Sequence, residues 1–426
     1  MAGWTKPNVT MPRYMARFSC IGGACEASCC SANWNISVTD RDYRKMRDKA
    51  PPSLKDDIKT AVRRTKRPDG TEAMLLKDIT DPSCVLLADD GGCRLHAAVG
   101  PGALPPVCYT YPREALIIDN EVTVFADLSC PEAVRLALFD PDAMVPEPAE
   151  FDPLTVNRCP SVKINSDGAE HHQVFEAIRG FCDSVLLRRD LPFWQRVAVI
   201  GMMFDLFRRS GINRPGIDAL EVVSALATRL NDGTVAAQLQ GVTGNPINQL
   251  QALMPLVERW LTSNFLGLKR AAKGHSVELV RELGYALKME TGGQATVDAY
   301  VQAYESHFAP YAARNPHVIE NLFRVPFTMH GLHALMHHGF DRLWEDGLVF
   351  ALTRMLLIAQ AGRRGAEFGD ADVVPVVMAM WRRVQHDNKF REEIRDAFQA
   401  AGCVSVMHLC ALLAPVGTVD GQHTIY

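Results

Sequence analysis

Cysteine is the residue type in this sequence whose spacing points most directly to chemistry. Eight of the 12 cysteines lie within the first 130 residues, and four of these fall in the stretch FSCIGGACEASCC, where glycines let the backbone wrap so that thiolates can converge. Clustered thiols in an intracellular chain of this size more often bind metal than form disulfides. We therefore expect eight metal ligands: Cys20, Cys25, Cys29, Cys30, Cys84, Cys93, Cys108 and Cys130.

The number of thiols bears on which metal they would hold. Thiolates in such numbers select zinc or an iron–sulfur cluster, and eight of them exceed the four ligands of one tetrahedral zinc ion. The spacing also differs from that of paired C-x2-C zinc knuckles. The sequence therefore favours an iron–sulfur cluster over zinc.

The segments that position these cysteines predict a small, irregular α+β module over residues 1–140. Residues 41–67 are rich in basic side chains with apolar residues at near-helical spacing, which predicts two short amphipathic helices broken at Pro51 and Pro52. The runs ALII and VTVF predict a hairpin. Because such short segments bury little surface each, we expect a metal to stabilise the module.

The chain changes character after the proline-rich and acidic stretch at residues 141–153, which predicts a linker. Residues 154–426 show helical periodicity, with Pro192 and Pro316 at helix starts. The predicted helices cover residues 170–188, 192–209, 217–230, 246–263, 275–289, 295–312, 316–328, 341–361, 371–386 and 388–401. The fold class is therefore mainly α: a cysteine-rich module followed by a helical bundle domain.

Charge and hydropathy exclude several classes of function. The net charge is −4, so no long-range field favours nucleic acid. A local net charge of +6 over residues 1–75 is best explained by solvated helix faces, with a patch for an acidic partner as the alternative. Since no apolar run reaches about 20 residues and no signal peptide is recognisable, we expect a cytoplasmic protein without membrane insertion.

The cysteine blocks, together with CRLH, CYTYPR and SCPEAVRLAL, closely resemble the flagellin lysine-N-methylase (FliB) family. HVIENLFR and VVMAMWRRVQHDNKF are similar to the C-terminal half of that family. The resemblance implies methyl transfer from S-adenosylmethionine to lysine side chains of flagellin, with a [4Fe–4S] cluster in the enzyme. The first blocks also resemble small proteins that chelate iron or zinc. The alternative is therefore a chelating protein whose helical half docks a protein partner.

Two familiar ways of binding S-adenosylmethionine are missing from the sequence. No strand runs into a glycine-rich turn and helix, as the dinucleotide-type fingerprint requires. The C-x3-C-x2-C triad of radical S-adenosylmethionine enzymes is also absent, because Cys30 directly follows Cys29. Polar and radical methyl transfer both stay open.

Methylating an amine by displacement needs a neutral lysine, whose pKa is ordinarily about 10.4, so the enzyme must desolvate it or supply a base. Within the blocks similar to the family, Tyr111, Glu320 and His386 are the candidate catalytic residues, and Tyr109 and Glu132 are further acids or bases. For Glu320 the alternative is an interhelical hydrogen bond, and for His386 a helix-end position.

The same blocks contain two candidates for binding the methyl donor, Arg113 and Asn321. Arg113 would bind the donor's carboxylate through two parallel hydrogen bonds. The alternative is a buried ion pair for Arg113 and an interhelical hydrogen bond for Asn321.

A histidine-rich stretch, MHGLHALMHHGF, lies outside these blocks. His333 and His337 are four residues apart and could bind metal from one helix face, with His330 a turn before. The stretch lacks the glutamate of H-E-x-x-H, so we predict a surface turn rather than a second metal site.

Overall fold

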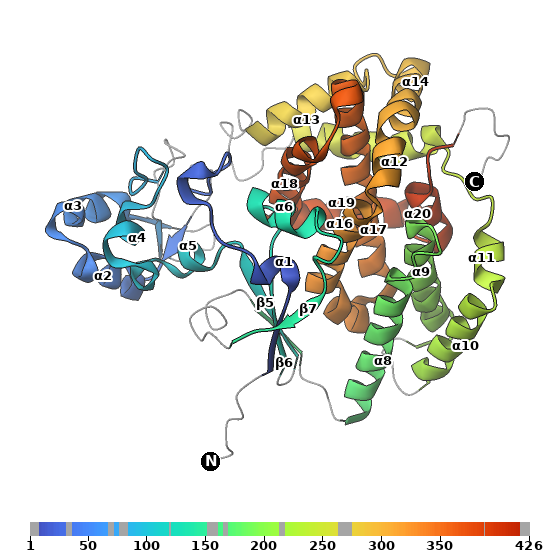
Figure 1. Cartoon of the computed structure of the whole chain (residues 1–426), viewed down its shortest axis with the longest axis horizontal. Coiled ribbons are helices and arrows are strands. Elements are labelled where there is room, and N and C mark those ends of the chain that lie inside the picture. The colour runs from blue at the N-terminus through green and yellow to red at the C-terminus, as the bar shows by residue number, and fades with distance from the viewer. Residues whose placement is uncertain are drawn as a thin grey trace. The chain divides into compact units, whose positions relative to one another are not determined.

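The computed structural model describes residues 8–30, 36–66, 72–75, 84–118, 121–150, 161–164, 169–212, 218–262, 275–386 and 388–417 (Figure 1). The chain divides into two compact units. The N-terminal unit comprises residues 1–136 and 145–163, and the helical unit comprises residues 137–144 and 164–426. The predicted linker at 141–153 is thus shared between the two units.

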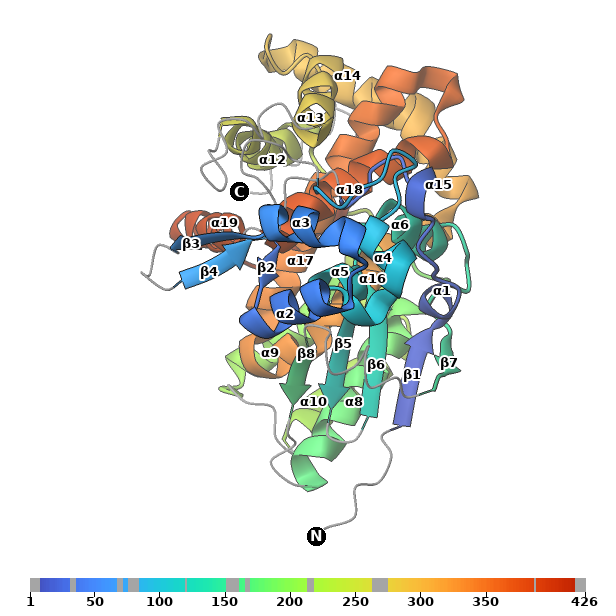
Figure 2. The same ribbon diagram turned by 90° about the vertical axis from the view of Figure 1, so that its left-hand side faces the viewer.

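The N-terminal unit contains a five-stranded sheet in the order β7–β1–β6–β5–β8 (Figure 2). Its strands are β1 (Asn8–Pro12), β5 (Arg113–Ile118), β6 (Glu121–Ala126), β7 (Pro146–Pro148) and β8 (Ser161–Ile164). β5 and β6 pair antiparallel, with Ala115 opposite Val124, which confirms the predicted hairpin. β1 pairs parallel with β6. The other strands were not predicted, because they are short and β7 reads Pro-Glu-Pro.

Helices and turns of this unit carry the cysteines around a small core of their own. The two predicted amphipathic helices are confirmed as α2 (Asp40–Lys49) and α3 (Pro52–Ala61). Their buried side chains, Met46, Leu54 and Ile58 among them, form this core together with Cys84, and Cys30, Cys93 and Cys108 pack against it. The other elements are α1 (Arg13–Ala16), α4 (Arg94–Val99), α5 (Pro106–Thr110), α6 (Pro131–Leu138), and a three-stranded sheet of β2 (Ser37–Val38), β4 (Glu72–Leu75) and β3 (Arg63–Lys66).

The helical unit is a bundle around the long helix α17 (Leu332–Arg364), against which α9, α13, α14, α16, α18 and α20 pack (Figure 1). α17 is buried on nearly all sides between Leu343 and Ala361, where apolar residues predominate and the polar Asp346, Arg354 and Gln360 are buried with them. The surrounding helices are α8 (Ala169–Leu186), α9 (Phe193–Arg209), α10 (Ala219–Asn231), α11 (Thr234–Leu239), α12 (Pro246–Thr262), α13 (His275–Ala286), α14 (Gly293–Ala303), α15 (Ala309–Arg314), α16 (Pro316–Pro326), α18 (Asp370–His386), α19 (Asn388–Ala400) and α20 (Val406–Leu413).

The mainly α fold class is confirmed, and a helix occupies each of the ten predicted segments. The prediction of a turn at the histidine-rich stretch is wrong. Its backbone is helical, running through a π-helical turn at Phe327–Gly331 into α17, with a break at Gly339, where φ is +47°. The histidine side chains at 330, 333 and 337 lie outside the described residues.

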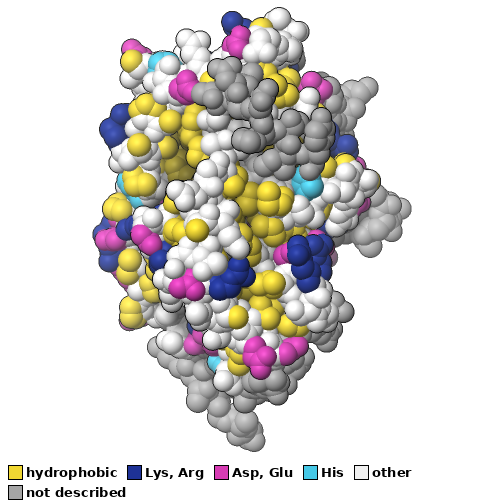
Figure 3. Space-filling view, turned by 90° about the vertical axis from the view of Figure 1, so that its right-hand side faces the viewer, with side chains coloured by type: hydrophobic (Ala, Val, Ile, Leu, Met, Phe, Trp, Pro, Cys, Tyr) yellow, Lys and Arg dark blue, Asp and Glu magenta, His cyan; other side chains and the backbone are white. Residues whose placement is uncertain are grey.

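The surface of the helical unit carries charges of both signs. Figure 3 looks from the side on which α10 and α11 lie in Figure 1, and shows hydrophobic side chains in patches between scattered basic and acidic ones. Among the described residues, no helix combines the length and the apolar character that crossing a membrane requires.

Candidate functional site

The eight predicted metal ligands all lie in the N-terminal unit, seven of them in loops and turns or directly before a helix and Cys108 within the short helix α5. Cys84 and Cys130 are buried, Cys20 is exposed, and the others are half-buried. Cys93 is the N-cap of α4, and Cys130 directly precedes α6. Backbone N–H groups at a helix N-terminus favour a thiolate, so these two positions suit metal-binding cysteines.

Backbone contacts hold the cysteine-bearing segments together. The N–H of Cys84 donates to the carbonyl oxygen of Cys30 at 2.9 Å. The loop that contains Gly23 lies directly on the turn at Gly91: a Cβ atom on Gly23 would collide with the carbonyl oxygen of Asp90, and one on Gly91 would lie 2.8 Å from the Cα atom of Gly23. Only glycine permits such an approach. The loop between Cys20 and Cys25 thus packs against the turn that precedes Cys93.

The Cys29 thiol is surrounded by other thiols. A hydrogen bond with Cys30 is the largest cause that raises its pKa, followed by burial and by the charges of Cys30, Cys20 and Cys108. A cation that binds here must therefore displace protons, because the surroundings disfavour free thiolates.

The pKa is also raised for the thiols of Cys130 and Cys93, which lie at the starts of α6 and α4. Burial raises the pKa of the Cys130 thiol to about 11; N–H groups of α6 lower it, and Cys25 and Cys20 add to the rise. Burial also raises the pKa of Cys93, with a contribution from Cys30. Thiols far apart in the sequence are therefore electrostatic neighbours.

These residues fit a thiolate-bound metal group in donor type, and several of their thiols are electrostatic neighbours. In the described part of the chain, no group of three or more His, Cys, Asp or Glu side chains could hold a metal ion as the side chains stand. Binding a metal would therefore require the thiols to reorient as they lose their protons. The ligand assignment stays a prediction.

Tyr111 and Arg113 contact residues that lie close to cysteines in the sequence, Ser129 before Cys130 and Phe18 before Cys20. The phenol of Tyr111 shares a hydrogen bond of 3.0 Å with the hydroxyl of Ser129, which is fully buried and precedes Cys130. The guanidinium of Arg113 lies over the ring of Phe18, 5.0 Å from its centroid, in a cation–π contact. The sequence analysis missed Ser129, although its place in the SCPE block was a signal.

The other acid and base candidates of the sequence are distributed over both units. Glu132 pairs with Arg135 at 3.0 Å in the first turn of α6, and Tyr109 packs against the cysteine-lined core. His386 is the last residue of α18, and its side chain lies outside the described residues.

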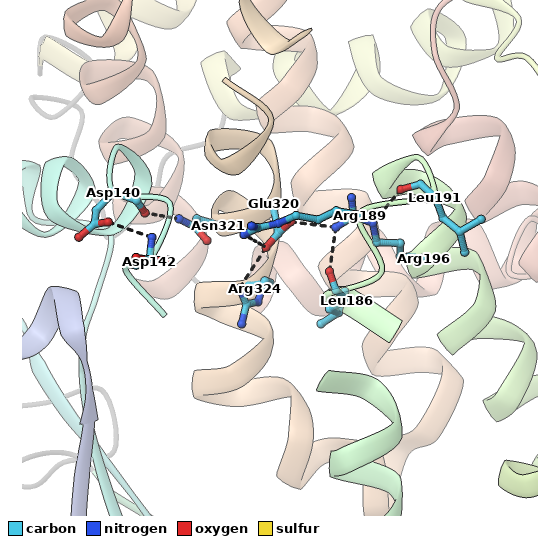
Figure 4. Close-up of polar contacts among 9 residues, drawn as sticks. All are labelled: Asp140, Asp142, Leu186, Arg189, Leu191, Arg196, Glu320, Asn321 and Arg324. Atoms are coloured by element: carbon cyan, nitrogen blue, oxygen red, sulfur yellow. Dashed lines mark hydrogen bonds and ion pairs between the residues drawn. The ribbon is translucent and has the colours of Figure 1, made fainter. Parts of the chain in front are cut away.

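Glu320 is buried in the helical unit, with a side chain only 3% exposed, and three arginines hold its two oxygens (Figure 4). Arg196 donates to Oε2 at 2.8 Å, Arg324 to Oε1 at 3.1 Å, and Arg189 to both oxygens at 3.2 and 3.3 Å. Burial would raise the pKa of Glu320, but the hydrogen bonds from Arg189 and Arg196 outweigh it and hold the pKa below its ordinary value. Such a carboxylate is a weak base, so the geometry favours the structural alternative.

Asn321 is fully buried on the same helix and donates from Nδ2 to the carbonyl oxygen of Asp140 at 3.0 Å (Figure 4). Its Oδ1 accepts no hydrogen bond from the described residues. The side-chain amide of Asn321 thus links the segment after α6 to α16, while its Oδ1 stays a buried acceptor. Its role in binding the methyl donor stays a prediction.

The contact between Gly23 and the turn at Gly91 gives a direct test of how the cysteine segments assemble. We expect Gly23→Ala to destabilise the N-terminal unit by about 1–3 kcal/mol, because the added methyl group overpacks a backbone contact. Gly102→Ala is the matched control, since a Cβ at Gly102 meets nothing within 4 Å. Urea denaturation and hydrogen exchange at residues 20–30 measure the effect. Equal protection in the two variants would contradict the packing.

Comparisons with known proteins agree with this architecture. The family model for the FliB lysine N-methylase C-terminal domain matches residues 179–412. The lysine-N-methylase of Salmonella choleraesuis (strain SC-B67) is 31% identical over 423 residues, and that of Salmonella typhimurium (strain LT2) is 28% identical over 416 residues. Each match covers 94% of this chain and 98% of the relative. The flagellar biosynthetic protein FliU of Salmonella muenchen is 29% identical over 136 residues, which are 32% of this chain and 80% of that protein. No solved structure matches.

Proposed function

Because the chain belongs to the FliB lysine N-methylase family, we propose that it methylates lysine side chains of flagellin with S-adenosylmethionine as methyl donor and a [4Fe–4S] cluster held by cysteines of the N-terminal unit. The observation that carries the proposal is the grouping of thiols from separate segments of a chain that matches lysine-N-methylases over nearly its whole length. An all-thiol donor set suits iron–sulfur chemistry.

Residues of the N-terminal unit would hold the cluster and bind the methyl donor. A cluster held by these cysteines would supply iron chemistry for binding and activating the methyl donor. Cys93 and Cys130, at the starts of α4 and α6, receive backbone N–H groups that stabilise their thiolates once the protons leave. The hydrogen bond between Tyr111 and Ser129 fixes the turn before Cys130. Arg113 keeps its guanidinium beside this region, where it is a candidate for the donor's carboxylate.

Anaerobic purification followed by two measurements tests the proposal. We expect iron and sulfide in the ratio of a four-iron cluster, with broad visible absorption that colours the protein brown. We also expect methyl groups on flagellin lysines after incubation with S-adenosylmethionine, detected by mass spectrometry. Colourless protein with bound zinc and no methyl transfer would instead favour the alternative, a chelating protein that docks a partner.

A further inference from the structure

Two contacts in the N-terminal unit fasten the segment that carries Cys20 and Cys25 to the segment that carries Cys130. The first contact joins Tyr14 to Ala126: the fully buried phenol donates to the carbonyl oxygen of Ala126 at 2.9 Å and accepts from its N–H at 3.0 Å. β1 runs parallel to β6, so the two strands end at the same edge of the sheet (Figure 2). The chain beyond Tyr14 and the chain beyond Ala126 therefore leave the sheet side by side, each with its cysteines ahead.

The second contact is made by Arg135, which lies in α6. Its Nη2 pairs with Oε1 of Glu26, 109 residues away in the sequence, and its Nη1 lies 3.0 Å from Oε2 of Glu132. Glu26 directly follows Cys25, and Cys130 directly precedes α6. One guanidinium therefore links the residue after Cys25 to the helix that begins after Cys130.

The two ends of this link differ in how firmly they are held. α6 is a fixed base for Arg135, because Ala133 and Val134 on the same helix are fully buried. Glu26, in contrast, is exposed, in the loop between Cys25 and the next cysteine. The position of Cys25 relative to Cys130 is therefore set from the side of α6.

The thiols that this link brings together are those that disfavour each other's charge. The charges of Cys25 and Cys20 contribute to the raised pKa of Cys130, which shows that the three thiols face one another. As the protons leave, the resulting thiolates repel and would drive the two segments apart. A cation that binds both segments opposes this separation before any metal is present.

We propose that Arg135 is a positioning residue, which holds the segment of Cys25 against Cys130 through Glu26 and so prepares these thiols to bind the metal group. The identity of that group rests on the proposed function, to which the inference adds a residue that assembles part of the ligand set. Arg135 acts on the ligands and contacts neither reactant. A loop that is ordered beforehand loses less conformational freedom when it binds, so the ion pair should raise the affinity for the metal group.

Thiol cross-linking in the metal-free, full-length protein tests the positioning directly. We expect Arg135→Gln to lower the yield of cross-links between Cys25 and Cys130 severalfold, measured with a short bifunctional thiol reagent and peptide mass spectrometry. Glu26→Gln should lower it to the same extent. The double variant should lower it no further, because both changes remove one contact. Arg135→Lys keeps a positive charge and should restore part of the yield.

A second ion pair of the same unit supplies the matched control. Glu147 pairs with Arg13 at 2.8 Å and, like Glu26, joins an arginine more than 100 residues away, but neither residue adjoins a cysteine. Glu147→Gln should therefore cross-link as the wild type does. Urea unfolding followed by circular dichroism confirms that all variants are folded.

Titration of the metal-free protein with iron and sulfide measures the effect on the metal group. We expect Arg135→Gln to lower the affinity about 3–10-fold, between the effect of an exposed ion pair and that of a residue in contact with a metal ligand. At saturating iron and sulfide, kcat for flagellin methylation should return to the wild-type value. A residue that contacts the reactants would not recover in this way.

The outcomes separate this inference from the proposed function. Cross-linking and affinity that stay at the wild-type level in Arg135→Gln would overturn the inference. Losses that add up in the double variant would overturn it too, because Arg135 and Glu26 would then act independently, and so would a kcat that stays low in the fully loaded variant. If the wild type transfers no methyl group, the proposed function fails, and the cross-linking of the metal-free protein still decides whether Arg135 positions the thiols.

Discussion

Cys29→Ser is expected to remove the proposed cluster and to reduce lysine methylation to background. Cys29 has more thiol neighbours acting on it than the other cysteines of the unit for which such effects are resolved, and its replacement takes away a thiolate at the centre of the group. Metal binding in such a module is largely folding energy, so the N-terminal unit should also lose protection. Iron content, a flagellin methylation assay and hydrogen exchange over residues 15–135 measure the three effects. Cys25→Ser should behave in the same way.

A matched cysteine outside the unit controls for the substitution itself. Cys403→Ser changes a half-buried thiol that follows α19, and it should keep full iron content and activity. The helices of the helical unit should keep their protection in every variant, because their core contains none of the eight cysteines. Full iron content in Cys29→Ser and Cys25→Ser would show that other cysteines are the ligands.

Removing the metal from the wild-type protein should reproduce part of this result without a mutation. Since the pKa of Cys29 and Cys130 is raised, metal binding must release protons, and metal affinity should fall as the pH is lowered. Chelation followed by titration with iron and sulfide at several pH values measures this. An affinity that does not change with pH would contradict thiol ligands.

Much of the fold could be predicted because it depends on local signals. Pro192 is the N-cap of α9 and Pro316 begins α16, where the sequence placed helix starts. The hairpin of β5 and β6 needed only two short apolar runs and a turn. In contrast, the parallel pairing of β1 with β6 joins segments more than 100 residues apart, and no local pattern in NVTMP indicates it. The turn predicted at the glycine-containing histidine stretch was wrong because the bundle continues the helix through it.

For the candidate site too, the sequence predicted what depends on residue type and missed what depends on contacts between distant segments. Residue type was enough to identify the cysteines as a group, but not the contact of Gly23 with the turn at Gly91, which only the folded chain reveals. Arg196 interrupts the apolar run FWQRVAVIGMMF, and a charge on a buried helix predicts a buried partner without naming it. The partner, Glu320, lies 124 residues away.

Glu320→Ala is expected to destabilise the helical unit by about 3–5 kcal/mol, because it leaves Arg196 and Arg324 buried without their carboxylate. The matched control is Glu278→Ala, which removes a glutamate paired with Arg281 on the surface, where its side chain is 56% exposed. That change should cost less than about 1 kcal/mol. The free energy of unfolding from urea titration, followed by helical circular dichroism, measures both. Equal losses would mean that the arginines find other partners and that Glu320 does not hold the bundle together.

The pH dependence of stability separates the structural role of Glu320 from a catalytic one. Its pKa is lowered in the folded protein, so its contribution is complete above the ordinary pKa of a glutamate and is lost as the pH falls through the lower folded value. The stability difference between the wild type and Glu320→Gln should therefore be constant near neutrality and shrink below about pH 4. If Glu320 instead served as the base, Glu320→Gln would keep this stability and lose methylation with a shifted pH profile. We expect the reverse, because a carboxylate whose two oxygens bind three guanidinium groups has little affinity left for a proton from lysine.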